Sequence, residues 1–143
     1  MGEPTAYVEV RVTAPDAHTA GRLAHLLVEE HLAACAKVLP GVTSVYRWEG
    51  VVEATPEHLL LIVSTAERFE AIRERVRAEH PYDTPEVLAV PVVAADARYA
   101  AWLEESVGPS TGRGAADGSE DSSDERVAHG AAADGGSSGP AQA

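Results

Sequence analysis

The sequence predicts an α+β domain in which an antiparallel sheet carries helices on one face. Apolar residues between positions 7 and 107 switch repeatedly between a two-residue period, typical of strands, and a period near 3.6, typical of helices. Beyond that stretch, residues 109–143 contain one Val and no Leu, Ile, Phe, Tyr or Trp. We therefore expect one domain over residues 1–108, followed by a disordered acidic tail over residues 109–143, which cannot bury enough apolar surface to fold.

The first predicted strand and helix follow each other directly. Residues 7–13 alternate between apolar and polar side chains, as expected of a half-buried strand. Asp16 suits a helix N-cap, and the apolar spacing after it predicts a helix over about residues 17–33.

A long hairpin is predicted next. Residues 35–39 and 42–49 form one strand that Pro40-Gly41 interrupts, and Gly50 marks the turn. Pro56 interrupts the return strand, where we expect a bulge. The apolar run at residues 59–63 predicts a strand that is buried on both faces.

The last third of the domain repeats the helix and strand order. Thr65 is expected to cap a second helix, and residues 80–85 form a connection bracketed by prolines. Residues 87–93 predict a fourth strand, and Pro91 inside it implies an edge position or a bulge. Asp96 is expected to cap a short final helix.

The resulting order, β-α-β-β-α-β plus a C-terminal helix, is the ferredoxin-like pattern, with two helices on one face of an antiparallel sheet. The other face is not explained by a single chain, because the run at residues 59–63 does not alternate. We therefore expect a second copy of the chain to cover that face.

Composition excludes several classes of function. The net charge of −12 argues against nucleic acid and anionic membrane surfaces, both of which require clustered basic residues. No stretch approaches the ~18 apolar residues of a membrane span, and residues 1–12 do not have the pattern of a signal peptide. Cys35 is the only cysteine, which suits a reducing compartment and makes the cytoplasm the expected location.

Several motifs of the domain are distinctive: they are Val12-Thr13-Ala14-Pro15-Asp16, Leu32-Ala33-Ala34-Cys35, Leu39-Pro40-Gly41-Val42-Thr43-Ser44-Val45-Tyr46-Arg47-Trp48-Glu49-Gly50, His80-Pro81-Tyr82-Asp83-Thr84-Pro85-Glu86 and Trp102-Leu103. Together they resemble the CutA divalent-cation tolerance proteins, over roughly residues 6–106. The resemblance implies a tight homotrimer similar to the PII signalling proteins, with long hairpins laid against neighbouring subunits. It further implies tolerance to divalent cations, copper above all, and no established catalytic activity.

His80 is the leading candidate metal ligand, with Glu79 and Glu86 as possible carboxylate partners, because imidazole suits Cu(II) and Zn(II). The copper site of the resembled family uses a Cys and a His-His pair, where this chain has Val12, Glu79 and His80. The alternative is that His80 only caps the preceding helix. Any cation is expected to be a bound partner and not an obligatory cofactor.

Tyr46, Trp48, Glu53 and Tyr82 are the expected residues of an inter-subunit cleft or interface, since an aromatic pair on one face of a hairpin marks a contact surface. The family's lysines after the hairpin glycine and near the end of the third strand are replaced by Val51 and Val63. This weakens the case for an anion or nucleotide in the cleft between subunits. The alternative function is a PII-like scaffold or regulatory module that binds a protein or a small metabolite there, and the missing Cys and second His favour it.

Catalysis is not expected. Acylphosphatases share the fold but hold an anion in the loop after the first strand. Here that loop contains Pro15, which lacks an N–H group, and the acidic Asp16.

Overall fold

The computed structural model describes residues 6–108. Expectations for the acidic tail lie outside these residues. The chain runs through the elements β1 (Tyr7–Ala14), α1 (Ala17–Glu29), β2 (Cys35–Trp48), β3 (Val51–Thr65), the 3₁₀ turn η1 (Ala66–Arg68), α2 (Phe69–Glu79), β4 (Leu88–Pro91) and α3 (Ala97–Val107). The four strands form one sheet in the order β2-β3-β1-β4, and every neighbouring pair is antiparallel. The predicted α+β fold and element order are therefore confirmed.

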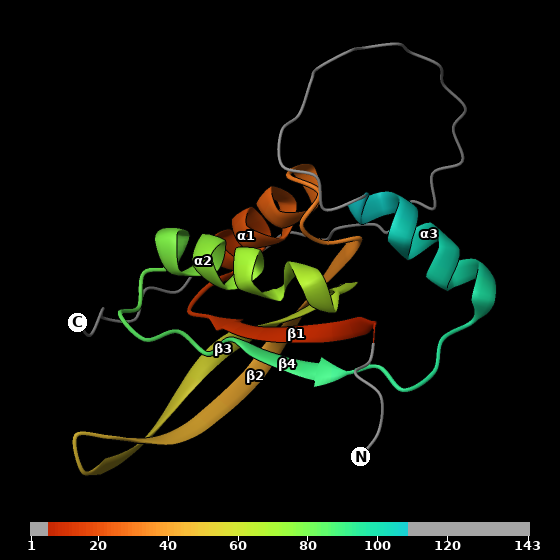
Figure 1. Cartoon of the computed structure of the whole chain (residues 1–143). Helices are drawn as coiled ribbons and strands as arrows, with labels where there is room; N and C mark the ends of the chain where they lie inside the picture. Colours follow the sequence, from red (N-terminus) through yellow and green to blue (C-terminus); the bar gives the residue numbers. More distant parts are fainter. Residues whose placement is uncertain (1–5, 109–143) are drawn as a thin grey trace. The chain divides into compact units, whose positions relative to one another are not determined.

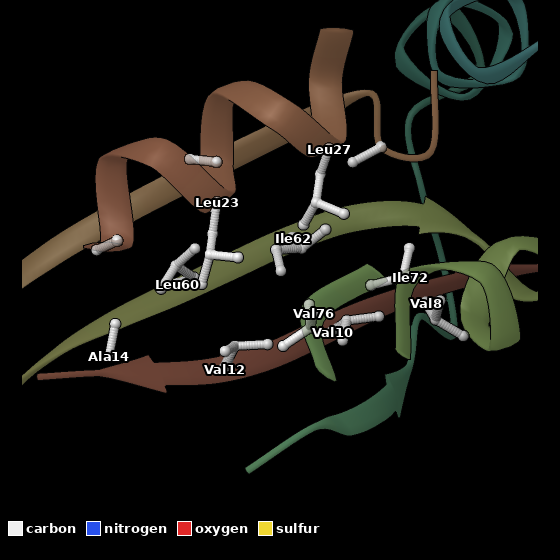
Figure 2. Packing of buried hydrophobic residues seen from close by; sticks show 13 residues of the cluster. Val8, Val10, Val12, Ala14, Leu23, Leu27, Leu60, Ile62, Ile72 and Val76 are labelled. Atoms are coloured by element: carbon white, nitrogen blue, oxygen red, sulfur yellow. The ribbon is translucent and has the colours of Figure 1, made fainter. Parts of the chain in front are cut away.

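Helices α1 and α2 cover one face of this sheet (Figure 1). Leu23 and Leu27 of α1, with Ile72 and Val76 of α2, pack onto alternate residues of β1 and β3 (Figure 2). The fully buried strand residues of this cluster are Val10, Val12, Ala14, Leu60 and Ile62. One contiguous core thus lies between the two helices and a single face of the sheet.

Helix α1 begins where predicted and ends earlier. Asp16 Oδ1 accepts a hydrogen bond from the Thr19 N–H at 2.7 Å, so the predicted N-cap is confirmed. The helix stops at Glu29 and not near Ala33, because His31 adopts a left-handed backbone conformation with φ of 59°. The N–H groups of Leu32 and Ala33 then bond to the Leu27 carbonyl oxygen, which closes the helix end.

The hairpin extends beyond the sheet as a two-stranded arm (Figure 1). Glu49 and Gly50 form its turn with φ values of 47° and 81°. The register shifts between Leu39 and Val42, where Pro40-Gly41 places one surplus residue in β2. The predicted bulge at Pro56 is wrong: Pro56 pairs with Thr43 without any shift, since β3 has only β2 as a neighbour at that point and one edge needs no N–H donor.

Two further boundaries differ from the prediction. Thr65 precedes the η1 turn, and its side chain makes no capping hydrogen bond. Strand β4 is shorter than residues 87–93 because pairing with β1 ends at Pro91, and β4 is an edge strand, as Pro91 indicated. Asp96 caps α3 as predicted, with Oδ2 accepting the Tyr99 N–H at 3.0 Å.

Candidate functional site

His80 sits at the C-terminal end of α2, and its imidazole is buried. Nε2 lies 2.7 Å from the Thr13 carbonyl oxygen, and Nδ1 lies 3.1 Å from the Tyr82 backbone nitrogen. A carbonyl oxygen can only accept and an N–H can only donate, so Nε2 carries the proton and Nδ1 accepts. His80 is therefore a neutral imidazole whose two nitrogens tie the end of β1 to the loop after α2.

Glu79 is engaged with two arginines. Its carboxylate lies 3.1 Å from Arg22 of α1 and 2.7 Å from Arg75 of α2, and Arg75 also meets Glu30 at 2.8 Å. The hydrogen bonds that Arg75 donates to Glu30 first, and then to Glu79, raise the pKa of Arg75 above its ordinary value. The two helices are thus joined at this end by a chain of alternating charges.

The three predicted metal ligands do not meet as a set. Glu79 and His80 are adjacent but both are engaged, and Glu86 lies exposed in the loop before β4. Within residues 6–108, no group of three His, Cys, Asp or Glu side chains is placed to hold a metal ion. A cation at His80 would have to replace one of its two hydrogen bonds, so cation binding there stays a prediction.

Tyr82 connects this loop to the base of the hairpin arm. Its hydroxyl donates to Glu57 Oε2 at 3.3 Å, and its ring centroid lies 4.7 Å from that of His80. Burial raises the pKa of Tyr82 to about 12, and the Glu57 carboxylate adds to the effect. The phenol therefore stays protonated and acts as a hydrogen-bond donor at neutral pH.

Glu57 is a site residue that the sequence reasoning missed. Its exposed fraction is only 6%, although it is an acid on a strand. The available signal was its spacing. Counting back from Leu61 and Leu59 in steps of two reaches Glu57, which places an acid on the same strand face as these leucines.

The predicted interface residues of the arm do share one face. Register pairs Tyr46 with Glu53 and Trp48 with Val51, and the side chains of directly paired residues lie on the same side of the sheet. The Tyr46 hydroxyl donates to Glu53 Oε2 at 3.5 Å and accepts from the Thr55 hydroxyl at 3.4 Å. Tyr46 and Trp48 remain well exposed, so this face of the arm presents aromatic side chains beside the polar side chains of Glu53 and Thr55.

The sheet face opposite α1 and α2 carries both leucines and charged side chains, and it is only partly covered. Leu39, Leu59, Leu61 and Leu88 point to this side by register, and Leu39 and Leu88 are exposed. Helix α3 shields one end, where Leu103 and Val107 pack against Tyr7, Ala34 and Val63. The rest of this surface, named here the open face, continues onto the Tyr46 side of the arm.

A comparison with protein families decides the identity. The family model for the CutA1 divalent ion tolerance protein matches residues 8–106. The chain belongs to the CutA1 family. The "Divalent-cation tolerance protein CutA" of Thermus thermophilus is 44% identical over 99 residues, which span 69% of this chain and 96% of that protein. The chloroplastic CutA protein of Arabidopsis thaliana is 41% identical, and the match spans 69% of this chain and 54% of the plant protein.

Solved CutA1 structures share the fold. The divalent cation tolerance protein of Thermus thermophilus superposes with a TM-score of 0.70 at 43% identity, covering 71% of this chain and 99% of that one. The protein of Archaeoglobus fulgidus, described as periplasmic, gives a TM-score of 0.70 at 33% identity and covers 71% and 99%. These names place CutA1 proteins in more than one compartment. Among the helices described in this chain, none is long and apolar enough to cross a membrane.

Proposed function

We propose that this CutA1-family chain serves in divalent-cation tolerance as a non-catalytic homotrimer in the cytoplasm. The observation that carries the proposal is the open face. Leu88 is 56% exposed, and the arm adds Trp48 at 50% and Val51 at 59%. Large apolar side chains that are exposed on one face of a sheet and its arm are typical of a contact between protein chains. A second copy of the chain is the partner that the family resemblance implies.

The non-catalytic part of the proposal is supported by the loop after β1. An enzyme that holds an anion there needs free N–H donors at the start of α1. In this chain Pro15 offers none, and the Asp16 carboxylate already occupies the Thr19 N–H, which lowers the pKa of Asp16 below its ordinary value. The missing donor and the acid at the helix start both disfavour a phosphate or carboxylate substrate in this loop.

The role of the cation is proposed at the level of the family and not of a ligand set. Within one copy, Glu79, His80 and Glu86 do not fit a metal centre as they stand, because two of them are committed to internal partners. This geometry favours the second candidate function, a trimeric scaffold or regulatory module whose clefts between copies bind a protein or a small metabolite.

Native mass spectrometry of the full chain, titrated with Cu(II) and Zn(II), separates these functions. A three-chain mass with saturable metal that is lost in His80→Ala supports direct cation binding. His25→Ala is the matched control, since His25 lies exposed on α1. A three-chain mass with only non-saturating metal adducts supports the scaffold. A single-chain mass contradicts the trimer.

A further inference from the structure

Glu57 is a buried acid without a basic partner in its own chain's described part. It is almost fully buried, and the Tyr82 hydroxyl at 3.3 Å is its one side-chain hydrogen-bond partner within residues 6–108. No basic side chain of this described part pairs with it. A buried carboxylate is costly unless a cation or several donors compensate it. Its compensation is therefore expected from outside the single chain.

Lys37 has the complementary requirement. It is the only lysine of the whole sequence, and it lies exposed on the open face, in register with Leu61. Its same-side neighbours along β2 are Cys35 and Leu39, and it makes no ion pair within the described residues. If another copy covers this face, the ammonium group loses water and needs an acid.

Glu57 and Lys37 of one copy are too far apart to pair with each other. Lys37 is opposite Leu61, and Glu57 lies four residues further along β3, which corresponds to about 13 Å at the strand rise. The other charges of this face are already used, because Arg11 pairs with Glu9 at 3.2 Å. Within the described part of the chain, the hydrogen-bond partner of the Glu53 side chain is the Tyr46 hydroxyl. Glu53 is less buried than Glu57, so leaving it uncompensated costs less.

We propose that Lys37 of one copy binds the Glu57 carboxylate of its neighbour, beside the Tyr82 hydroxyl, in a cyclic head-to-tail contact. This inference rests on the proposed trimer and names the pair that fixes its register. In such a ring each copy supplies one ammonium and one carboxylate, so every copy is compensated only when the ring is closed. The Tyr82 hydroxyl, by donating to Glu57, orients the carboxylate toward the incoming ammonium.

The single lysine makes a direct test possible. Carbodiimide activation joins a carboxylate to an amine only at contact distance, and Lys37 is the chain's sole side-chain amine. We would cross-link a mixture of isotopically light and heavy full-length chains and map the products by mass spectrometry. A Lys37–Glu57 link between light and heavy chains is the expected result. A trimer whose Lys37 links to Glu53, or to other acids only, overturns the pair and leaves the proposed function intact.

A mutant cycle provides the second test and does not depend on a reagent. Lys37→Met and Glu57→Gln should each raise the subunit dissociation constant, on the order of a hundredfold, because each leaves one buried charge unpaired. The subunit dissociation constant of the double variant should be no higher than that of either single variant. Glu53→Gln is the matched control on the same strand face and should change the constant less than about threefold. Additive effects of Lys37→Met and Glu57→Gln would contradict the pair. A monomeric wild-type chain would instead contradict the proposed function itself.

Discussion

The two faces of the sheet are completed in different ways. On one face, Val10, Val12, Leu60 and Ile62 are fully buried under α1 and α2. On the other, Leu39 and Leu88 remain exposed, and α3 shields only one end. Neighbouring residues of the same strand therefore serve two purposes. The helix-covered face stabilises the single chain, whereas the open face carries the residues through which the chain is proposed to meet its copies.

The largest effect should come from the helix-covered face. Leu60→Ala removes a fully buried side chain and leaves a cavity, so we expect the free energy of unfolding to fall by about 2–5 kcal/mol. Urea denaturation followed by circular dichroism measures this loss. Leu61→Ala is the matched variant on the open face, and it should mainly raise the subunit dissociation constant. Equal effects of both variants on both quantities would show that the two faces do not differ in role.

A smaller loss is expected where the helix-covered layer meets the loop at His80. His80→Ala leaves the Thr13 carbonyl and the Tyr82 N–H without their buried partner, at a cost of about 1–3 kcal/mol in the free energy of unfolding. Urea denaturation of the variant beside His25→Ala measures the difference. A variant as stable as wild type would mean that the two hydrogen bonds are replaced without loss.

The N-cap of α1 should contribute less to the free energy of unfolding than Leu60 or His80 does. Its contribution concerns only the helix-covered layer. Asp16→Ala removes the acceptor of the Thr19 N–H and should cost about 1 kcal/mol. Because the folded pKa of Asp16 is lowered, this stabilisation is present above its ordinary pKa of 3.8 and is lost as the pH falls below it. The difference in the free energy of unfolding between wild type and Asp16→Ala should therefore be smaller at pH 3 than at pH 7. Asp96→Ala, which uncaps α3, is the comparison variant.

The smallest effect concerns Tyr82, which connects the loop after α2 to the base of the hairpin arm. Its folded pKa of about 12 exceeds the ordinary value of 10.0, so its contribution to stability is complete below pH 10 and disappears as the pH rises toward 12. Ultraviolet titration should show a late tyrosinate step near pH 12 that Tyr82→Phe abolishes. Glu57→Gln should shift this step only part of the way toward 10.0, because burial is the larger cause. An unchanged step would mean that the Glu57 charge has no influence there.

The fold was predictable because its signals are local. Alternation in β1, the acidic caps Asp16 and Asp96, and Gly50 at the hairpin turn each specify an element from nearby residues. The boundary errors arose where longer-range contacts decide. His31 ends α1 by adopting a left-handed backbone conformation, which its residue type alone does not predict. Its Nδ1 contacts the carbonyl oxygen of Ser106, 75 positions away.

The candidate site was less predictable for the same reason. His80 was recognisable as a residue of interest, but its bonds to Thr13 and Tyr82 depend on how β1 and the loop after α2 come together. The engagement of Glu79 with Arg22 likewise requires the packing of α1 on α2. Side-chain type indicates what a residue could bind, whereas the tertiary fold determines whether its binding atoms are already occupied.

The bulge at Pro40-Gly41 determines which side of the sheet each later residue of β2 faces. If every residue of β2 were paired regularly, with no bulge to take up the surplus residue, Val42 would pair with Pro56 instead of Glu57. Every later residue of β2 would then face the opposite side of the sheet. Tyr46 and Trp48 would then point toward the side on which α1 and α2 lie. The bulge thus decides which chemistry each arm surface presents, because it keeps Tyr46 opposite Glu53 although β2 carries one residue more than β3 in this stretch.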